Sequence, residues 1–151
     1  MAKTLTFYQV AGLNRALRKL PKTANANLRD ASQVIAEKVA KDAAGNARSD
    51  GGVAALVAPT IRSGRDRVPV VKMGGSARLP GPRNRNGKRQ TIGDVIWGAE
   101  FGGGARPTTQ QFKPHLGQTG YFLWPTVRGD REFIEKEYGD AILEAIDEAA
   151  R

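Results

Sequence analysis

The chain has 151 residues, a length typical of one domain, and a formal net charge of +9. It contains no cysteine, which excludes disulfides and thiolate metal sites. Its longest apolar run, residues 53–58, is far shorter than the roughly 20 residues that span a bilayer, so we expect no membrane partner. Residues 1–12 lack the apolar core and cleavage site of a signal peptide, and we expect synthesis in the cytoplasm.

The charge is unevenly distributed along the chain. Residues 129–151 carry eight acids and three cations, a local net charge of −5, which leaves +14 on residues 1–128. A basic surface of this kind either serves solubility or faces a polyanion or an acidic protein surface. A basic surface that meets the acidic C-terminal segment of a neighbouring copy would favour head-to-tail association.

The first third of the chain has helical periodicity. Apolar residues at steps of three and four predict a helix over residues 9–20, which Pro21 ends. A second, longer helix is predicted over residues 23–47, with Thr23 or Asn25 as its N-cap and an Ala-rich apolar stripe. We expect Gly45 and then residues 49–52 to end it.

The β-branched residues of 53–73 predict two strands. The runs AALVAPTIR and RVPVVKM, separated by SGRDR, are typical of a hairpin with a glycine-containing turn. Pro59 and Pro69 lie within these runs, and proline cannot donate to a ladder, so we expect both at edges or bulges.

Residues 74–93 are rich in Gly, Pro and Asn and have no periodic apolar face, which predicts a long, flexible basic loop. The loop contains no acid. Within residues 76–91 it either binds nucleic acid through phosphates or becomes ordered only against a neighbouring protein. No aromatic residue interleaves with its cations, which disfavours base stacking there. The five cations are Arg78, Arg83, Arg85, Lys88 and Arg89.

Residues 94–104 combine a short apolar element with three glycines. We expect Trp97 and Phe101 to anchor this element in the core, and Gly102 to let the chain turn away from it. The sequence after the glycines lacks the Lys and Ser/Thr of a phosphate-binding loop. Glu100 is predicted to accept backbone N–H groups of the glycine turn or to pair with an arginine, the alternative being a catalytic acid.

The last part of the chain has an apolar run and a helix. The run at residues 120–127 ends near Pro125, and a helix is predicted after it with Asp130 as N-cap. We therefore expect an α+β fold with a single domain over residues 1–151. A small, mostly antiparallel sheet would be flanked by the long helix and the C-terminal helix, with long loops between them.

The sequence gives little indication of catalysis. His115 is the one histidine and lies in an expected loop, where packing or a surface role is common. No spacing of His, Asp or Glu suggests a metal site, and we expect no cofactor. A small regulatory enzyme that uses Glu100 is the alternative least favoured by these observations.

Two motifs carry a resemblance to a known family. Residues 97–102 read WGAEFG and residues 121–126 read YFLWPT, between a helical N-terminal third with a hairpin and a final helix. This arrangement resembles the neck or tail-completion proteins of long-tailed bacteriophages, the group that includes minor tail protein Z-like proteins. The positions that carry the resemblance are Trp97, Glu100, Phe101, Gly102, Phe122, Trp124 and Pro125.

The resemblance implies a structural virion protein of the head–tail connector and no enzyme. It implies a ring of identical subunits, a hexamer by analogy with tail symmetry, that contacts other neck and tail proteins. The subunit would act in tail completion, as tail terminator or in another neck ring. The basic portion could then face DNA in the lumen. The alternative function is a nucleic-acid-binding module that uses the basic loop at residues 76–91.

Overall fold

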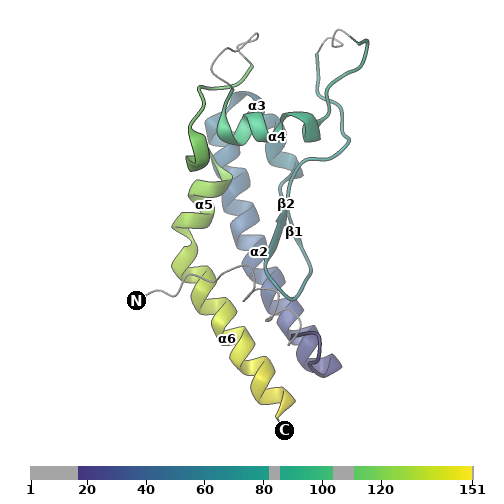
Figure 1. Ribbon diagram of the computed structural model, residues 1–151, viewed down its shortest axis with the longest axis vertical. Coiled ribbons are helices and arrows are strands. Elements are labelled where there is room, and N and C mark those ends of the chain that lie inside the picture. Colours follow the sequence, from purple (N-terminus) through teal and green to yellow (C-terminus); the bar gives the residue numbers. More distant parts are fainter. Residues whose placement is uncertain (1–16, 82–85, 104–110, 151) are drawn as a thin grey trace.

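The computed structural model describes residues 17–81, 86–103 and 111–150, so the helix expected at residues 9–20 lies largely outside the described residues. The described part has an α+β fold, as predicted, and helices dominate it. Figure 1 shows an elongated molecule with helix α2 (Lys22–Asp50) along its length. The β-hairpin lies along one side of α2, and α5 (Leu123–Gly129) and α6 (Arg131–Ala149) follow the other side.

Helix α2 confirms the long helix expected from periodicity, but its ends differ. It begins directly after Pro21, and no side chain caps it, so the predicted caps Thr23 and Asn25 lie inside the first turn. Gly45 also lies within the helix, which ends at Gly51, where φ is 76°. A proline before the first turn presets the backbone and a glycine ends the helix, so neither end needs a polar side chain.

The first predicted strand is wrong over most of its length. Residues AALVAPT form α3 (Gly52–Val57) and a 3-10 helix, η1 (Ala58–Thr60), because this run packs its apolar side against α2 and α4. An antiparallel hairpin is confirmed, with Ser63 of β1 (Arg62–Gly64) opposite Val71 of β2 (Val70–Lys72). Its turn was misplaced, because Ser63 and Gly64 belong to β1 and the connecting residues 65–69 contain no glycine. Pro69 precedes β2 directly, where no ladder donor is required.

The basic segment has no helix or strand among its described residues, as expected, apart from one bridge between Arg78 and Thr91. It ends earlier than predicted, because Ile92 already begins α4 (Ile92–Phe101). Thr91 and Asp94 form a capping box at this N-terminus, in which each side chain accepts the other residue's backbone N–H. The short apolar element predicted at residues 94–101 is therefore a helix.

The C-terminal part contains two consecutive helices and a short 3-10 helix, η2 (Gly117–Thr119), before them. The apolar run at residues 120–127 leads into α5, and Pro125 lies in the first turn of that helix, where a missing N–H does no harm. Asp130 occupies the N-cap position of α6, but its side chain caps nothing. It instead bonds Lys38 at 2.8 Å, so the predicted capping role of Asp130 is wrong.

The core consists of two clusters that share α2. One joins the C-terminal half of α2 to α3, α4 and the fully buried Phe122. The other joins the start of α2 to α6 through Leu28, Ala141 and Ala145. Alanines along α2 let its neighbours approach closely on several sides. Tyr138 of α6 also donates to the Arg67 carbonyl at 3.0 Å, which connects α6 to the hairpin turn. In the described part of the chain, no helix has the length and apolarity needed to cross a bilayer.

Candidate interaction sites

Glu100 joins the two sequence motifs in space. Its side chain is fully buried, and its two carboxylate oxygens accept the backbone N–H groups at the start of α5. The distances to the nitrogens of Phe122, Leu123 and Trp124 are 3.3, 2.9 and 2.9 Å. The backbone adds a bond of 2.7 Å from Tyr121 N to Glu100 O. The carboxylate thus satisfies orphan donors at a helix N-terminus.

The prediction for Glu100 named the right chemistry and the wrong donors. A backbone-accepting carboxylate was expected, but at the glycine turn that follows α4. The donors belong to residues 122–124 instead, because Gly120 leaves room for the carboxylate: a Cβ at that position would collide with Glu100 Oε1. Gly120 has φ of 73°, a conformation that favours glycine.

Gly102 provides the turn that the sequence predicted after α4. Its φ is 84°, and a Cβ there would collide with the Pro114 carbonyl. The close approach allows Gly103 N to donate to Lys113 O at 2.7 Å and Leu116 N to donate to Phe101 O at 3.0 Å. Gly104 lies outside the described residues.

Trp97 is not a core anchor, which corrects the prediction from the sequence. It is 64% exposed and stacks on Phe101 with ring centroids 5.9 Å apart. The reason is the phase of α4: Ile92, Val95 and Ala99 take the buried side and leave residue 97 opposite them. Phe101 is half-buried. In the second motif Phe122 is buried, whereas Trp124 is 45% exposed.

The basic segment has two arms, the chain around Arg78 and residues 87–91, and a hollow of about 550 Å³ lies between them. Three of the predicted cations, Arg78, Lys88 and Arg89, line this hollow together with Gly87 and Thr91. The Arg78–Thr91 bridge brings the arms together, so cations eleven residues apart in sequence lie around one space. Arg83 and Arg85 lie outside the described residues.

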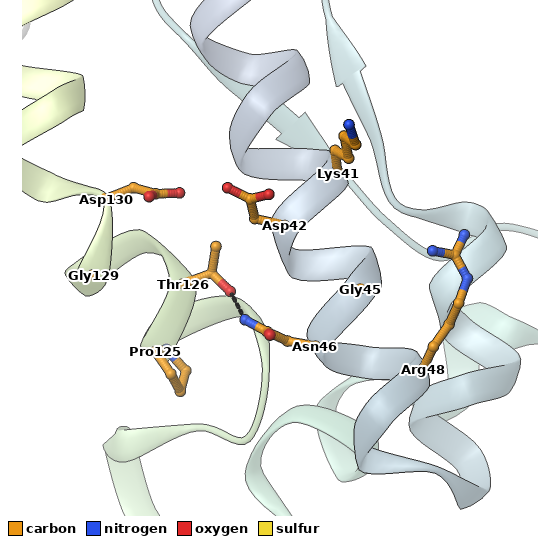
Figure 2. Close-up of a pocket in the computed structure, with 9 residues that line it drawn as sticks. All are labelled: Lys41, Asp42, Gly45, Asn46, Arg48, Pro125, Thr126, Gly129 and Asp130. Carbon is orange, nitrogen blue, oxygen red and sulfur yellow. Dashed lines mark hydrogen bonds between the residues drawn. The ribbon is translucent and has the colours of Figure 1, made fainter.

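A second hollow, which sequence reasoning missed, lies between α2 and the α5–α6 junction and has a volume of about 710 Å³. Figure 2 shows the carboxylates of Asp42 and Asp130 pointing toward one another across it. Lys38 bridges them at 2.7 and 2.8 Å, and these contacts raise the pKa of Lys38, with the Asp130 hydrogen bond as the largest cause. The Asn46–Thr126 bond of 2.7 Å lies beside them.

One oxygen in this second hollow lacks a partner. Asp130 Oδ2 is buried and accepts no hydrogen bond, while Oδ1 accepts from Lys38. The sequence offered one signal for the site, the i,i+4 pair of Lys38 and Asp42, but nothing that placed Asp130 beside it. Because the Lys38 ammonium bonds one carboxylate on α2 and one at the start of α6, the arrangement suits a structural connection between these helices.

The described part of the chain shows no cluster of side chains that could act together in catalysis or metal binding. His115 is exposed and belongs to none of the hollows described above. Within residues 17–81, 86–103 and 111–150, no three His, Cys, Asp or Glu side chains are grouped to hold a metal. Comparisons with family models, curated proteins and solved structures found no match to this chain.

Proposed function

We propose that the chain is a structural subunit of the head–tail connector of a long-tailed bacteriophage. It would be made in the host cytoplasm and assemble as a ring in the virion neck, which we take to be a hexamer by analogy with tail symmetry. The subunit would form interfaces with its own copies and with neighbouring neck and tail proteins. No catalytic step is part of the proposal.

The observation that carries the proposal is the contact between the two motifs. Glu100 of the first motif and residues 122–124 of the second belong to one hydrogen-bonded unit, although 22 positions separate Glu100 from Phe122. Two motifs that contact each other in the fold support the resemblance to the connector family better than two motifs without a contact would. Gly102 and Phe122 contribute to the same unit as a turn and a core side chain.

The surface also supports an assembling protein. Large apolar side chains are exposed on several elements of this small chain, and such side chains often mark contact regions when they cluster. On α6, Leu143 and Ile146 lie among the exposed acids Glu144 and Asp147. The most exposed of the large apolar side chains, with more than half of their surface open to solvent, are Val34, Trp97, Leu143 and Ile146.

The experiment is to look for rings and for the protein in particles. Negative-stain electron microscopy of the purified chain should show closed rings, and mass spectrometry of purified virions should detect the protein at a fixed copy number per tail. A chain that stays monomeric at every concentration and is missing from particles would contradict the proposal.

The cationic hollow favours a second candidate, a nucleic-acid-binding module. Its Arg78, Lys88 and Arg89 are exposed around one space, as expected of side chains that contact phosphates. This function predicts DNA or RNA binding that weakens steeply between low and physiological salt. If fluorescence anisotropy with labelled DNA and RNA showed no binding even at low salt, this candidate would be lost.

A further inference from the structure

We infer that two oppositely charged surfaces at the two ends of the molecule bind each other between neighbouring copies. The first, the loop-end surface, consists of Leu56, Pro80, Arg78, Lys88 and Arg89. The second, the α6 stripe, consists of Leu143, Glu144, Ile146 and Asp147. The inference rests on the proposed ring and names the residues of its subunit contact.

The loop-end surface combines cations with exposed apolar side chains. A smaller hollow of about 230 Å³ is lined by Leu56, Leu79 and Pro80 together with Gln90 and Gln111. Leu56 is 42% exposed. Asp94 of α4 accepts hydrogen bonds from the Thr91 backbone and hydroxyl in the capping box rather than from an arginine of this surface. Exposed apolar side chains beside cations fit a partner with exposed apolar side chains and the opposite charge.

The α6 stripe has the matching chemistry. Leu143 is 62% and Ile146 is 51% exposed, and at a spacing of three residues they share one face of the helix with Asp147. Glu144 flanks this face and is also exposed. Residues 137–150 contain five acids and no cation.

The acids of the stripe lie where the fold of one subunit does not favour them. The C-terminus of a helix carries the negative end of its dipole, and cations are stabilising there. The last turn of α6 has no basic residue, yet Asp147 lies near that end. A cationic partner would relieve this local repulsion. The acids would therefore stabilise the contact between copies, although they destabilise the end of α6 in the free subunit.

One copy cannot bring the two surfaces together. Asn27 near the start of α2 bonds Glu148 at 2.9 Å, which fixes the α6 stripe at that end. The loop-end surface lies beyond the other end of α2, where α3 and α4 pack (Figure 1). The 29 residues of α2 span about 43 Å. Two different patches that meet between copies form a heterologous contact, which can close into a ring.

Complementary charge reversal tests the inference. Arg78→Glu with Arg89→Glu reverses one surface, and Glu144→Lys with Asp147→Lys reverses the other. In sedimentation velocity, each double variant alone should self-associate at least tenfold more weakly than the wild type. An equimolar mixture should regain association, because each variant then offers the charge that the other lacks. Far-UV circular dichroism melts establish that both variants are folded.

The control is Arg48→Glu with Arg62→Glu, which makes the same charge change at two exposed arginines outside both surfaces. It should associate as the wild type does. If folded reversal variants assemble normally, or if the mixture fails to regain association, the inference is overturned while the ring proposal stands. It is also overturned if the Arg78/Arg89 variant loses only DNA binding. A wild type that never associates would contradict both.

Discussion

The buried carboxylate of Glu100 gives the sharpest test of the fold. In Glu100→Gln the side chain keeps its size, and its one oxygen can retain the Phe122 and Leu123 donors at the Oε2 position. Its amide group then faces Trp124 N–H, which loses its acceptor. A hydrogen bond to a charged group contributes about 1.5–3 kcal/mol. We therefore expect Glu100→Gln to lower the free energy of unfolding by about 2–3 kcal/mol.

Glu100→Ala should cost more, about 4 kcal/mol, because it leaves three buried N–H groups without an acceptor and opens a cavity. Urea unfolding followed by circular dichroism measures both changes; with a slope of about 2 kcal/mol per molar, Glu100→Gln lowers the midpoint by about 1 M or more. The exposed Glu37→Gln is the control and should stay within about 0.5 kcal/mol of the wild type. An unchanged midpoint for Glu100→Gln would refute the structural role. A variant that is stable and assembles but loses an activity would indicate catalysis instead.

Three further substitutions test the helix ends and glycines. Gly102→Val should lower the free energy of unfolding by at least about 3 kcal/mol, because the residue has a positive φ and its Cβ would collide with the Pro114 carbonyl; a variant as stable as the wild type in urea would contradict this. Gly139→Ala, inside α6 with open space around its Cβ, should instead raise stability by about 0.5–1 kcal/mol, and a loss in the same assay would disprove the helical environment. Asp94→Asn should lower the melting temperature at pH 7. Hydrogen bonds from Thr91 lower the pKa of Asp94 below the ordinary value of an aspartate, so the ionised form stabilises the fold above about pH 4. This stabilisation is lost as pH falls through the folded-state pKa of Asp94, so the wild type and Asp94→Asn should then have the same melting temperature. A difference in melting temperature that did not narrow below pH 4 would count against the capping box.

Periodicity was a good guide to the long elements and a poor one to the short ones. Helix α2 repeats its apolar residues over many turns, which only one secondary structure explains. The run AALVA is too short to separate a buried strand from a buried helix, and packing against α2 decided for the helix α3. The hairpin was predictable only in part: β2 lies in the run RVPVVKM, whereas β1 includes Ser63 and Gly64 of the expected turn and residues 65–69, which connect the strands, contain no glycine.

For the candidate sites too, the sequence predicted what local residues determine and missed what tertiary packing determines. The chemistry of Glu100 followed from its type and its neighbours, but its donors lie 22 to 24 residues away and depend on how two loops return to α4. Trp97 was misplaced because an aromatic residue beside apolar ones is usually buried, and only the rotation of α4 shows its exposed side. The hollow at Asp42 and Asp130 depends on the docking of α6 on α2, which no local pattern encodes.

The connection between α4 and α5 has a consequence for how this protein can vary. Bonds from Gly103 to Lys113, from Leu116 to Phe101 and from Tyr121 to Glu100 anchor the chain on both sides of residues 104–112. Once both flanks are anchored, doubling the length of the chain between them costs only about 0.6 kcal/mol in closure entropy. The two flanks are therefore held by their own bonds, and a longer connection between them would cost the core little free energy.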